Sequence, residues 1–146
     1  MDTTDLGVVT GLVVDSSVLI HAERTRATTP EVILKIRAAF GDVPVVLSPI
    51  TVAELGHGIY HTATPEKAAH RRRFLDELVR HVPVHPISAT TAEIVARGGG
   101  KQALRGITVP FADLLIGACA LELGYAVATH NVRHFRLIPE LDVRTL

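Results

Sequence analysis

Several polar residues stand directly after apolar segments, where their side chains could perform chemistry. Asp15 follows the run LVV. Thr129, Asn131 and His134 come at or after the end of the run YAVA. An ionised carboxylate at the end of a buried strand needs polar partners or a cation, and neither Lys nor Arg stands close to Asp15 in the sequence. Both segments therefore predict a functional site at the ends of strands.

Short β-branched runs alternate with helical stretches along the chain, which favours a parallel sheet covered by helices on both faces. The fold class expected is α/β with a central, mainly parallel sheet, as one domain over residues 11–146 after a loose tail of residues 1–10. Strands are expected at 12–14, 45–47, around 84, at 125–128 and near 143, and helices at 17–24, 30–40, 51–61, 65–81, 89–104 and 112–123, with a further helical turn after residue 128.

This topology brings three acidic residues to one edge of the sheet. The carboxyl ends of parallel strands share an edge, and open sheets of this kind bind ligands there. Asp15 ends the first strand, and Glu54 lies in the first turn of the helix after the second strand. Asp113 opens a helix that runs antiparallel to the strand following it. We therefore expect these carboxylates to meet at that edge, together with Asn131 and His134.

Ordinary structural roles are alternatives for the same residues. Thr51 and Glu54 have the spacing of a capping box, and Asp113 suits the positive end of a helix dipole. Ser17 and Asn131 are plausible N-caps. However, three carboxylates at one edge repel one another unless a cation lies among them, and hard oxygen ligands suit Mg²⁺ or Mn²⁺. Caps and a metal site are compatible.

Four motifs in order carry a family resemblance: VVDSSVLI, SPITVAELGHGI, VPFADLLIGACALELGYAVATHNVRHF and RLIPELDV. With them the chain resembles PIN-domain proteins, and more narrowly the VapC toxins of bacterial and archaeal VapBC toxin–antitoxin pairs, over nearly its whole length after the first ten residues. The resemblance implies a PIN-like three-layer α/β/α domain and RNA cleavage that depends on Mg²⁺ or Mn²⁺. It also implies a homodimer and inhibition by a cognate VapB-like antitoxin.

The resemblance also implies roles for individual residues. The family's acidic metal-binding and catalytic positions are matched by Asp15, Glu54 and Asp113, and supporting positions around them by Ser16, Thr129 and Asn131. His134 stands where many PIN proteins carry a fourth acid, which leaves open how many metal ions are held. If His134 faces the site, we expect Mn²⁺ to support more activity than Mg²⁺.

Contact with RNA needs a local positive patch, because 15 Lys and Arg balance 15 Asp and Glu. A solvated helix face is the alternative interpretation for the basic residues. Two Tyr, four Phe and no Trp leave little for base stacking, so selectivity is expected to depend on RNA shape and backbone. The candidates for RNA contact are Arg71, Arg72, Arg73, Lys101 and Arg105.

Other features are interpreted as structural. His57 and His61 stand four residues apart on one expected helix, but the HExxH order is absent, so we interpret them as an incidental pair. The glycines at 98–100 lack the spacing of a phosphate loop and are expected to bend or loosen their helix. Cys119 is expected in the core. No apolar segment approaches the roughly 20 residues needed to span a membrane. The acidic start differs from a signal peptide, so a cytoplasmic setting is expected.

Three functions follow as hypotheses. The first is an endoribonuclease toxin that cleaves RNA with a metal-activated water. The second is a non-catalytic PIN-like module that binds RNA or protein, and the third is a housekeeping PIN nuclease in RNA maturation. Keeping three uncompensated acids favours catalysis, because a binding module does not need them.

Overall fold

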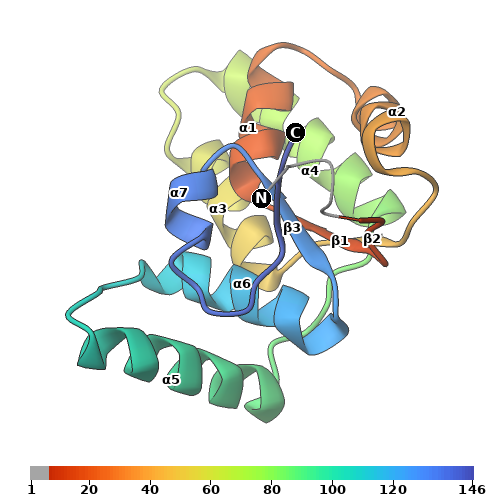
Figure 1. The fold of residues 1–146 in the computed structure, drawn as a ribbon. Helices are drawn as coiled ribbons and strands as arrows, with labels where there is room; N and C mark the ends of the chain where they lie inside the picture. Colours follow the sequence, from red (N-terminus) through yellow and green to blue (C-terminus); the bar gives the residue numbers. More distant parts are fainter. Residues whose placement is uncertain (1–6) are drawn as a thin grey trace.

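The computed structural model describes residues 7–146, and a four-stranded sheet lies at its centre (Figure 1). The strands stand in the order β2-β1-β3-β4, and every neighbouring pair is parallel. All the carboxyl ends therefore meet at one edge of the sheet. The strands are β1 (Leu12–Val14), β2 (Val45–Val46), β3 (Ala126–Thr129) and β4 (Val143–Thr145).

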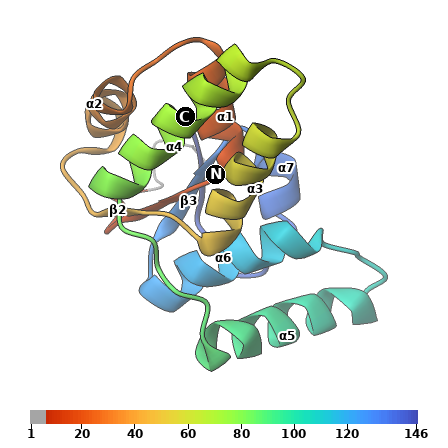
Figure 2. The same ribbon diagram turned by 180° about the vertical axis from the view of Figure 1, so that it is seen from behind.

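Helices cover both faces of the sheet and complete a three-layer α/β/α arrangement. The core on one face is built with α1 to α4, and the core on the other with α6 and α7, while α5 packs on the outside of α6 (Figures 1 and 2). The helices within the described residues are α1 (Ser16–Arg24), α2 (Thr29–Phe40), α3 (Pro49–Tyr60), α4 (Pro65–His81), α5 (Ala89–Leu104), α6 (Phe111–Leu123) and α7 (Val132–Phe135).

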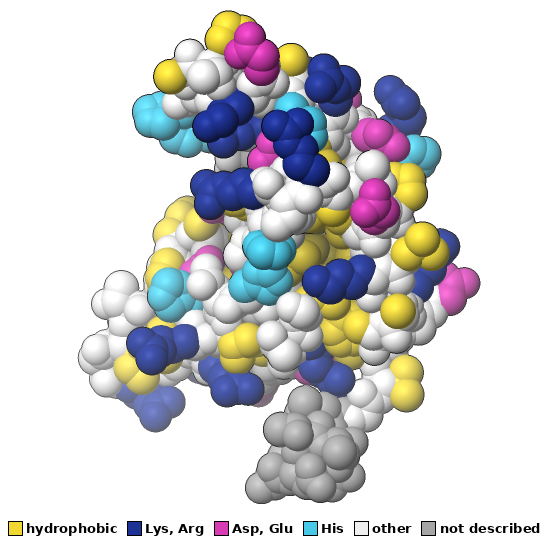
Figure 3. All heavy atoms as spheres, turned by 90° about the horizontal axis from the view of Figure 1, so that it is seen from above, with side chains coloured by type: hydrophobic (Ala, Val, Ile, Leu, Met, Phe, Trp, Pro, Cys, Tyr) yellow, Lys and Arg dark blue, Asp and Glu magenta, His cyan; other side chains and the backbone are white. Residues whose placement is uncertain are grey.

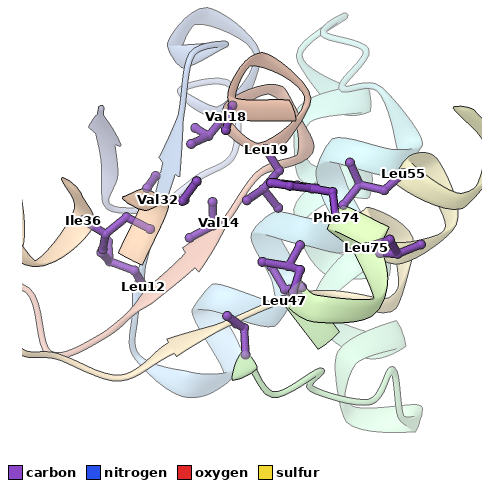
Figure 4. Packing of buried hydrophobic residues seen from close by; sticks show 14 of the residues in the cluster. Leu12, Val14, Val18, Leu19, Val32, Ile36, Leu47, Leu55, Phe74 and Leu75 are labelled. Carbon is purple, nitrogen blue, oxygen red and sulfur yellow. The ribbon is translucent and has the colours of Figure 1, made fainter. Parts of the chain in front are cut away.

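Alternation along the central strand divides the core between the two faces. Leu12 and Val14 point to the side of α1 to α4, where they belong to the same core cluster as Ile36 and Phe74 (Figure 4). Val13, between them, points to the side of α6 and packs with Phe135. Each of these β1 residues is at most 1% exposed, so β1 is buried on both faces, as parallel strands usually are. This rigid strand is what positions Asp15.

The predicted fold class and most of the predicted elements are confirmed. One expectation was wrong, because Val84 forms an isolated bridge with Leu47 and not a strand. The helix expected at 89–104 is confirmed as α5, which runs continuously through the glycines at 98–100. A Cβ on Gly99 would stand 3.1 Å from Leu114 Cδ1, so at this position a glycine lets α5 lie close against α6.

Three further expectations concern the tail, the membrane and the cysteine. Of the expected tail, residues 1–6 lie outside the described part, and Val9 is already buried in the core. In the described residues no helix is both long and apolar enough to cross a membrane. Cys119 is buried as expected, and its burial raises the pKa of its thiol to about 11. Its thiol therefore stays protonated at neutral pH.

Candidate active site

Asp15 lies at the carboxyl end of β1 and is held in place by hydroxyl groups. The carboxylate is 3% exposed, and its Oδ2 accepts hydrogen bonds from Ser17 Oγ at 2.7 Å and Thr129 Oγ1 at 2.8 Å. Among the described residues no side-chain donor reaches Oδ1. The two hydroxyls thus hold Oδ2 of Asp15 in place and leave Oδ1 available to a cation.

Ser17 was missed as a supporting residue. Its position suggested an N-cap, but α1 begins at Ser16, Asp15 occupies the cap position, and Ser17 lies inside the helix. From there its hydroxyl reaches back two residues to the carboxylate. The sequence feature that could have indicated this role is the pair of serines directly after Asp15. It does not show which serine donates a hydrogen bond to which carboxylate.

Glu54 comes from α3 and accepts a hydrogen bond from Ser16 Oγ at 3.1 Å. The capping-box interpretation of this residue is wrong, because Ser48 caps α3 and accepts from the Ile50 N–H. The helix begins at Pro49, so Glu54 lies in its second turn and not its first. Thr51, the expected cap, is fully buried inside the helix. Glu54 therefore has no capping role, and its carboxylate instead bonds to Ser16, beside Asp15.

Asp113 lies in the first turn of α6, as expected, and is joined there by His134 from α7. His134 Nδ1 stands 3.2 Å from Asp113 Oδ2, and the imidazole is half exposed. The residue at the position of the family's fourth acid therefore faces the acids. An imidazole stands where many PIN proteins have a fourth carboxylate, so the site has one carboxylate fewer.

The electrostatics of the acids follow from burial and mutual repulsion. Burial, and then the charges of Asp15 and Asp113, raise the pKa of Glu54, although the Ser16 hydrogen bond opposes this. Burial and then the charge of Asp15 raise the pKa of Asp113, against the effect of His134. Within residues 7–146 no Lys or Arg contributes to either shift. These carboxylates are close enough to disturb one another and have no cationic side chain to neutralise them.

The donor set fits a hard divalent cation. The described residues contain no group of three His, Cys, Asp or Glu that would enclose a metal ion as they stand. Mg²⁺, however, usually keeps several waters and takes only one or two carboxylates from the protein. The sheet edge offers oxygen donors of this kind, and burial together with mutual repulsion raises the pKa values of Glu54 and Asp113. A cation there would offset the repulsion.

The remaining predicted residues lie in different surroundings. Thr129 is fully buried, and its Oγ1 also accepts the Asn131 backbone N–H at 2.8 Å. Asn131 occupies the N-cap position of α7, but its side chain makes no capping bond and is exposed. Thr129 therefore links Asp15 to the turn that carries Asn131, whereas the Asn131 side chain stands free of this network within the described residues.

The basic residues of α4 do not form one uniform face. Arg71 lies between helices, where Nη1 donates to the Gly58 carbonyl at 2.7 Å. Arg72 pairs with Asp76 at 3.2 Å, which is the arrangement of an ordinary exposed helix. Arg73 is exposed. Of the three, Arg71 shares a pocket wall with Glu54.

Lys101 and Arg105 stand at the C-terminal end of α5. The chain then turns back to the start of α6, which carries Asp113, so these exposed cations lie at the same end of the α5 and α6 pair as the acids (Figure 1). Arg105 Nη1 donates to Gln102 Oε1 at 3.3 Å. They remain predictions for RNA contact.

The fold and these acids define a known class of protein. Residues 12–141 match the PIN domain family, and the chain belongs to that family. It is 29% identical to a Ribonuclease VapC of Rickettsia bellii over 136 residues, which are 93% of this chain and 96% of that protein. The sequence resemblance is thereby confirmed.

Solved structures with the same fold include toxin–antitoxin complexes. VapBC2 from Rickettsia felis, bound to a DNA fragment from its promoter, aligns with a TM-score of 0.79 at 19% identity, over 93% of this chain and 98% of that chain. VapBC-5 from Mycobacterium tuberculosis aligns with a TM-score of 0.72 at 26% identity, over 94% of this chain and 98% of that chain.

Proposed function

We propose that this chain is a Mg²⁺- or Mn²⁺-dependent endoribonuclease that acts in the cytoplasm as the toxin of a type II toxin–antitoxin pair. The observation that carries the proposal is the meeting of Asp15, Glu54 and Asp113 at one sheet edge, where no Lys or Arg of residues 7–146 neutralises Glu54 or Asp113. Similarity to a protein named Ribonuclease VapC supports RNA as the substrate class. Similarity to VapBC complexes supports the pairing with an antitoxin.

Asp15 and Asp113 would hold the principal ion, directly or through water. Glu54 would complete the shell, hold a second ion or orient the attacking water. Held by these residues, a divalent ion would supply Lewis-acid polarisation of the scissile phosphate, a more acidic water and positive charge near the leaving oxygen. Ser17 and Thr129 keep the Asp15 carboxylate in one orientation, and a fixed carboxylate needs no rearrangement during the reaction.

Cleavage of a defined RNA by the purified protein tests this proposal. With Mg²⁺ or Mn²⁺ the wild type should cleave and leave 5′-phosphate and 3′-OH ends, as expected when water attacks. A 2′,3′-cyclic phosphate would contradict the water mechanism. Equal cleavage by the Asp15→Ala, Asp113→Asn double variant would contradict the assignment of the acids.

The alternative functions predict different outcomes in the cell. A toxin should arrest growth when expressed alone, and the product of a neighbouring gene should relieve the arrest. Unimpaired growth with abundant folded protein would favour a housekeeping nuclease or a non-catalytic module. The raised pKa values of Glu54 and Asp113 favour the enzyme, because a binding module has no use for acids that destabilise it.

A pocket beside Glu54 suits the antitoxin. Its volume is about 80 Å³, its apolar wall includes Leu55 and Phe74, and its polar rim includes Glu23 and Arg71. We expect an antitoxin segment to place an apolar side chain there and a Lys or Arg against the acids, in place of the metal ion. Ile20, which is only partly buried, lines the same pocket, and Ile20→Ala should weaken relief by the antitoxin and leave RNA cleavage unchanged. Relief equal to wild type would argue against this surface.

A further inference from the structure

A second pocket lies between α1 and α2, on the other side of α1 from the pocket beside Glu54. Its volume is about 190 Å³, against about 80 Å³ for the pocket beside Glu54. Val18 and Val32 belong to its apolar wall, and Lys35 and Glu31 to its polar wall. Figure 3 shows this face, where histidine side chains border a hollow lined by hydrophobic side chains, with Lys or Arg across it. A cavity of about 150 Å³ accepts benzene, so this pocket has room for a planar ring.

Two imidazoles from distant parts of the chain meet at the border of this pocket. His21 lies on α1 and His130 follows β3, and their rings stand edge to face with centroids 5.4 Å apart at 74°. Both residues are exposed. The edge-to-face pair therefore presents an aromatic surface to solvent beside an apolar hollow. His57 and His61 also contact each other, but they stack on a single helix and line none of the pockets described above.

A short chain of hydrogen bonds joins this border to the acids. The His130 backbone N–H donates to Ser17 Oγ at 3.1 Å, and Ser17 Oγ donates to Asp15 Oδ2 at 2.7 Å. One serine thus separates the pocket border from a carboxylate of the candidate active site. A nucleic acid strand that places a phosphate at the acids would bring a neighbouring nucleotide to this pocket.

We propose that the pocket binds one unpaired nucleobase of the RNA substrate, next to the scissile phosphate. The base enters the hollow and stacks on the imidazole pair, and Lys35 contacts the adjoining backbone phosphate. This proposal rests on the proposed ribonuclease function and names a substrate subsite for it. The sequence has few Tyr and Phe and no Trp for base stacking. In this proposal the two imidazoles provide the stacking surface instead.

The surroundings favour a nucleobase over an antitoxin side chain. Stacking rings and a lysine suit a base and its phosphate, because each base has a π-face and the backbone is anionic. The pocket beside Glu54 also combines an acid with a basic side chain, Glu23 and Arg71, but none of the described histidines lines it, and its wall of aliphatic side chains and one Phe suits an apolar side chain. The two pockets thus differ in the chemistry that they offer.

Binding is tested with an inactive full-length protein, Asp113→Asn, and a short single-stranded oligoribonucleotide of mixed sequence. In NMR spectra the imidazole signals of His21 and His130 should shift on titration, and those of His57 and His61 should not. Replacing His21 and His130 by Ala should weaken binding about fivefold, the lower end of the cost of losing one base–aromatic stack. Replacement of both by Phe should restore binding, and His57→Ala with His61→Ala is the matched control.

Cleavage by the otherwise wild-type protein gives the second readout. The Ala variant of His21 and His130 should still cleave, but with a relaxed preference for the nucleotide beside the cut, whereas the control keeps the wild-type preference. Unchanged preference together with unshifted imidazole signals would overturn the subsite and leave the ribonuclease intact. Loss of antitoxin relief in the Ala variant, with RNA binding unchanged, would assign the pocket to the antitoxin and overturn the proposal. Absence of any cleavage by the wild type would refute the ribonuclease, while the NMR titration would still decide the subsite.

Discussion

The two ends of α6 carry carboxylates whose environments are opposite. Asp113 lies in the first turn of the helix and its pKa is raised, whereas Glu122 lies in the last turn and its pKa is lowered. The helix dipole acts in the reverse sense, because it stabilises negative charge at the N-terminus and disfavours it at the C-terminus. Burial at Asp113 and hydrogen bonds at Glu122 must therefore outweigh the effect of the dipole on these pKa values.

The neighbours explain the difference. Glu122 accepts hydrogen bonds from His85, Thr91 and Ser88, and these partners lower its pKa. Asp113 instead lies partly buried near Asp15, and His134 is the one partner that opposes the rise. The dipole contributes about 0.3 to 1 kcal/mol, which is less than one pKa unit, so burial and charge can reverse it.

We interpret this contrast as one between a structural acid, Glu122, and an acid that we propose to be functional, Asp113. At Glu122 the fold provides donors for the carboxylate and uses it to join the start of α5 to the end of α6. At Asp113 the fold provides one such partner among the described residues, His134, and the ionised carboxylate still bears a cost from burial and from the charge of Asp15. A cation from outside the chain is the natural means to remove that cost. The following predictions test whether the two ends of α6 really differ in this way.

The largest effect is expected from Asp113→Asn. RNA cleavage should fall by about 10²-fold or more, on the scale of losing one group that stabilises charge. Because the pKa of Asp113 is raised, its favourable contribution to folding is present at low pH and is lost as the pH rises through that pKa. At neutral pH and without metal, the variant should therefore melt at a higher temperature than wild type.

Metal linkage gives the matching control for this prediction. Mg²⁺ should raise the melting temperature of wild type and of Glu122→Gln, but hardly that of Asp113→Asn. Differential scanning calorimetry with and without Mg²⁺ measures all three. An equal response in the Asp113→Asn protein would mean that Asp113 does not hold the ion.

Replacing Glu122 by Gln should affect stability and its pH dependence, and not cleavage. The pKa of Glu122 is lowered, so its ionised form stabilises the fold above the unfolded-state value of about 4.3. That stabilisation is lost as the pH falls through the lowered pKa. At pH 7 the variant should be less stable by about 1 kcal/mol, and the difference should shrink in acid. Urea titrations at several pH values measure it, and equal stability at pH 7 would contradict the assigned role.

His134→Asp should make the site more like that of relatives with four acids. A carboxylate beside Asp113 should tighten Mg²⁺ binding by about tenfold and further destabilise the metal-free protein. Wild type should be more active with Mn²⁺ than with Mg²⁺, because imidazole binds Mn²⁺ better than it binds Mg²⁺. The difference in activity between the two ions should be smaller in the variant. Calorimetric titration with Mg²⁺ gives the affinity, and indistinguishable values would place His134 outside the metal site.

The smallest effect on cleavage is expected from Ser16→Ala. The Ser16 hydrogen bond lowers the pKa of Glu54, so its loss should raise that pKa further. Cleavage should fall a few fold, and the acid side of its pH profile should move to higher pH. Ser88→Ala removes a similar bond from Glu122 and serves as the control, with an unchanged profile. An identical shift in both variants would show that the effect is not specific to the site.

The sequence was sufficient to predict the sheet edge where the acids meet. The parallel topology follows from alternating strand and helix patterns, and it places Asp15, Glu54 and Asp113 at the same edge whatever the side-chain details. Helix limits were harder, because Pro49 and Ser48 start α3 earlier than the Thr51 pattern suggested. That error led to a predicted capping role for Glu54, whereas the N-terminus of α3 is capped by Ser48.

What the sequence could not give depends on contacts between distant residues. Ser16 and Ser17 are adjacent and chemically equal, yet helical geometry sends one to Glu54 and the other to Asp15. The His21 and His130 pair is similar, because more than a hundred residues separate its members. The regularly spaced pair, His57 and His61, is conspicuous in the sequence but lines no pocket described here. Sequence spacing predicts contacts between residues of one helix. Contacts between residues far apart in the sequence become visible only in the folded structure.

The central claim is that the acids at the sheet edge cleave RNA, and mapping of cellular RNA 5′ ends tests it most directly. Wild type and Asp15→Ala are expressed briefly to equal levels, and new 5′-phosphate ends are sequenced. Wild type should produce new ends at a limited number of positions, and Asp15→Ala should produce none of them. Identical maps from the two proteins would contradict the account.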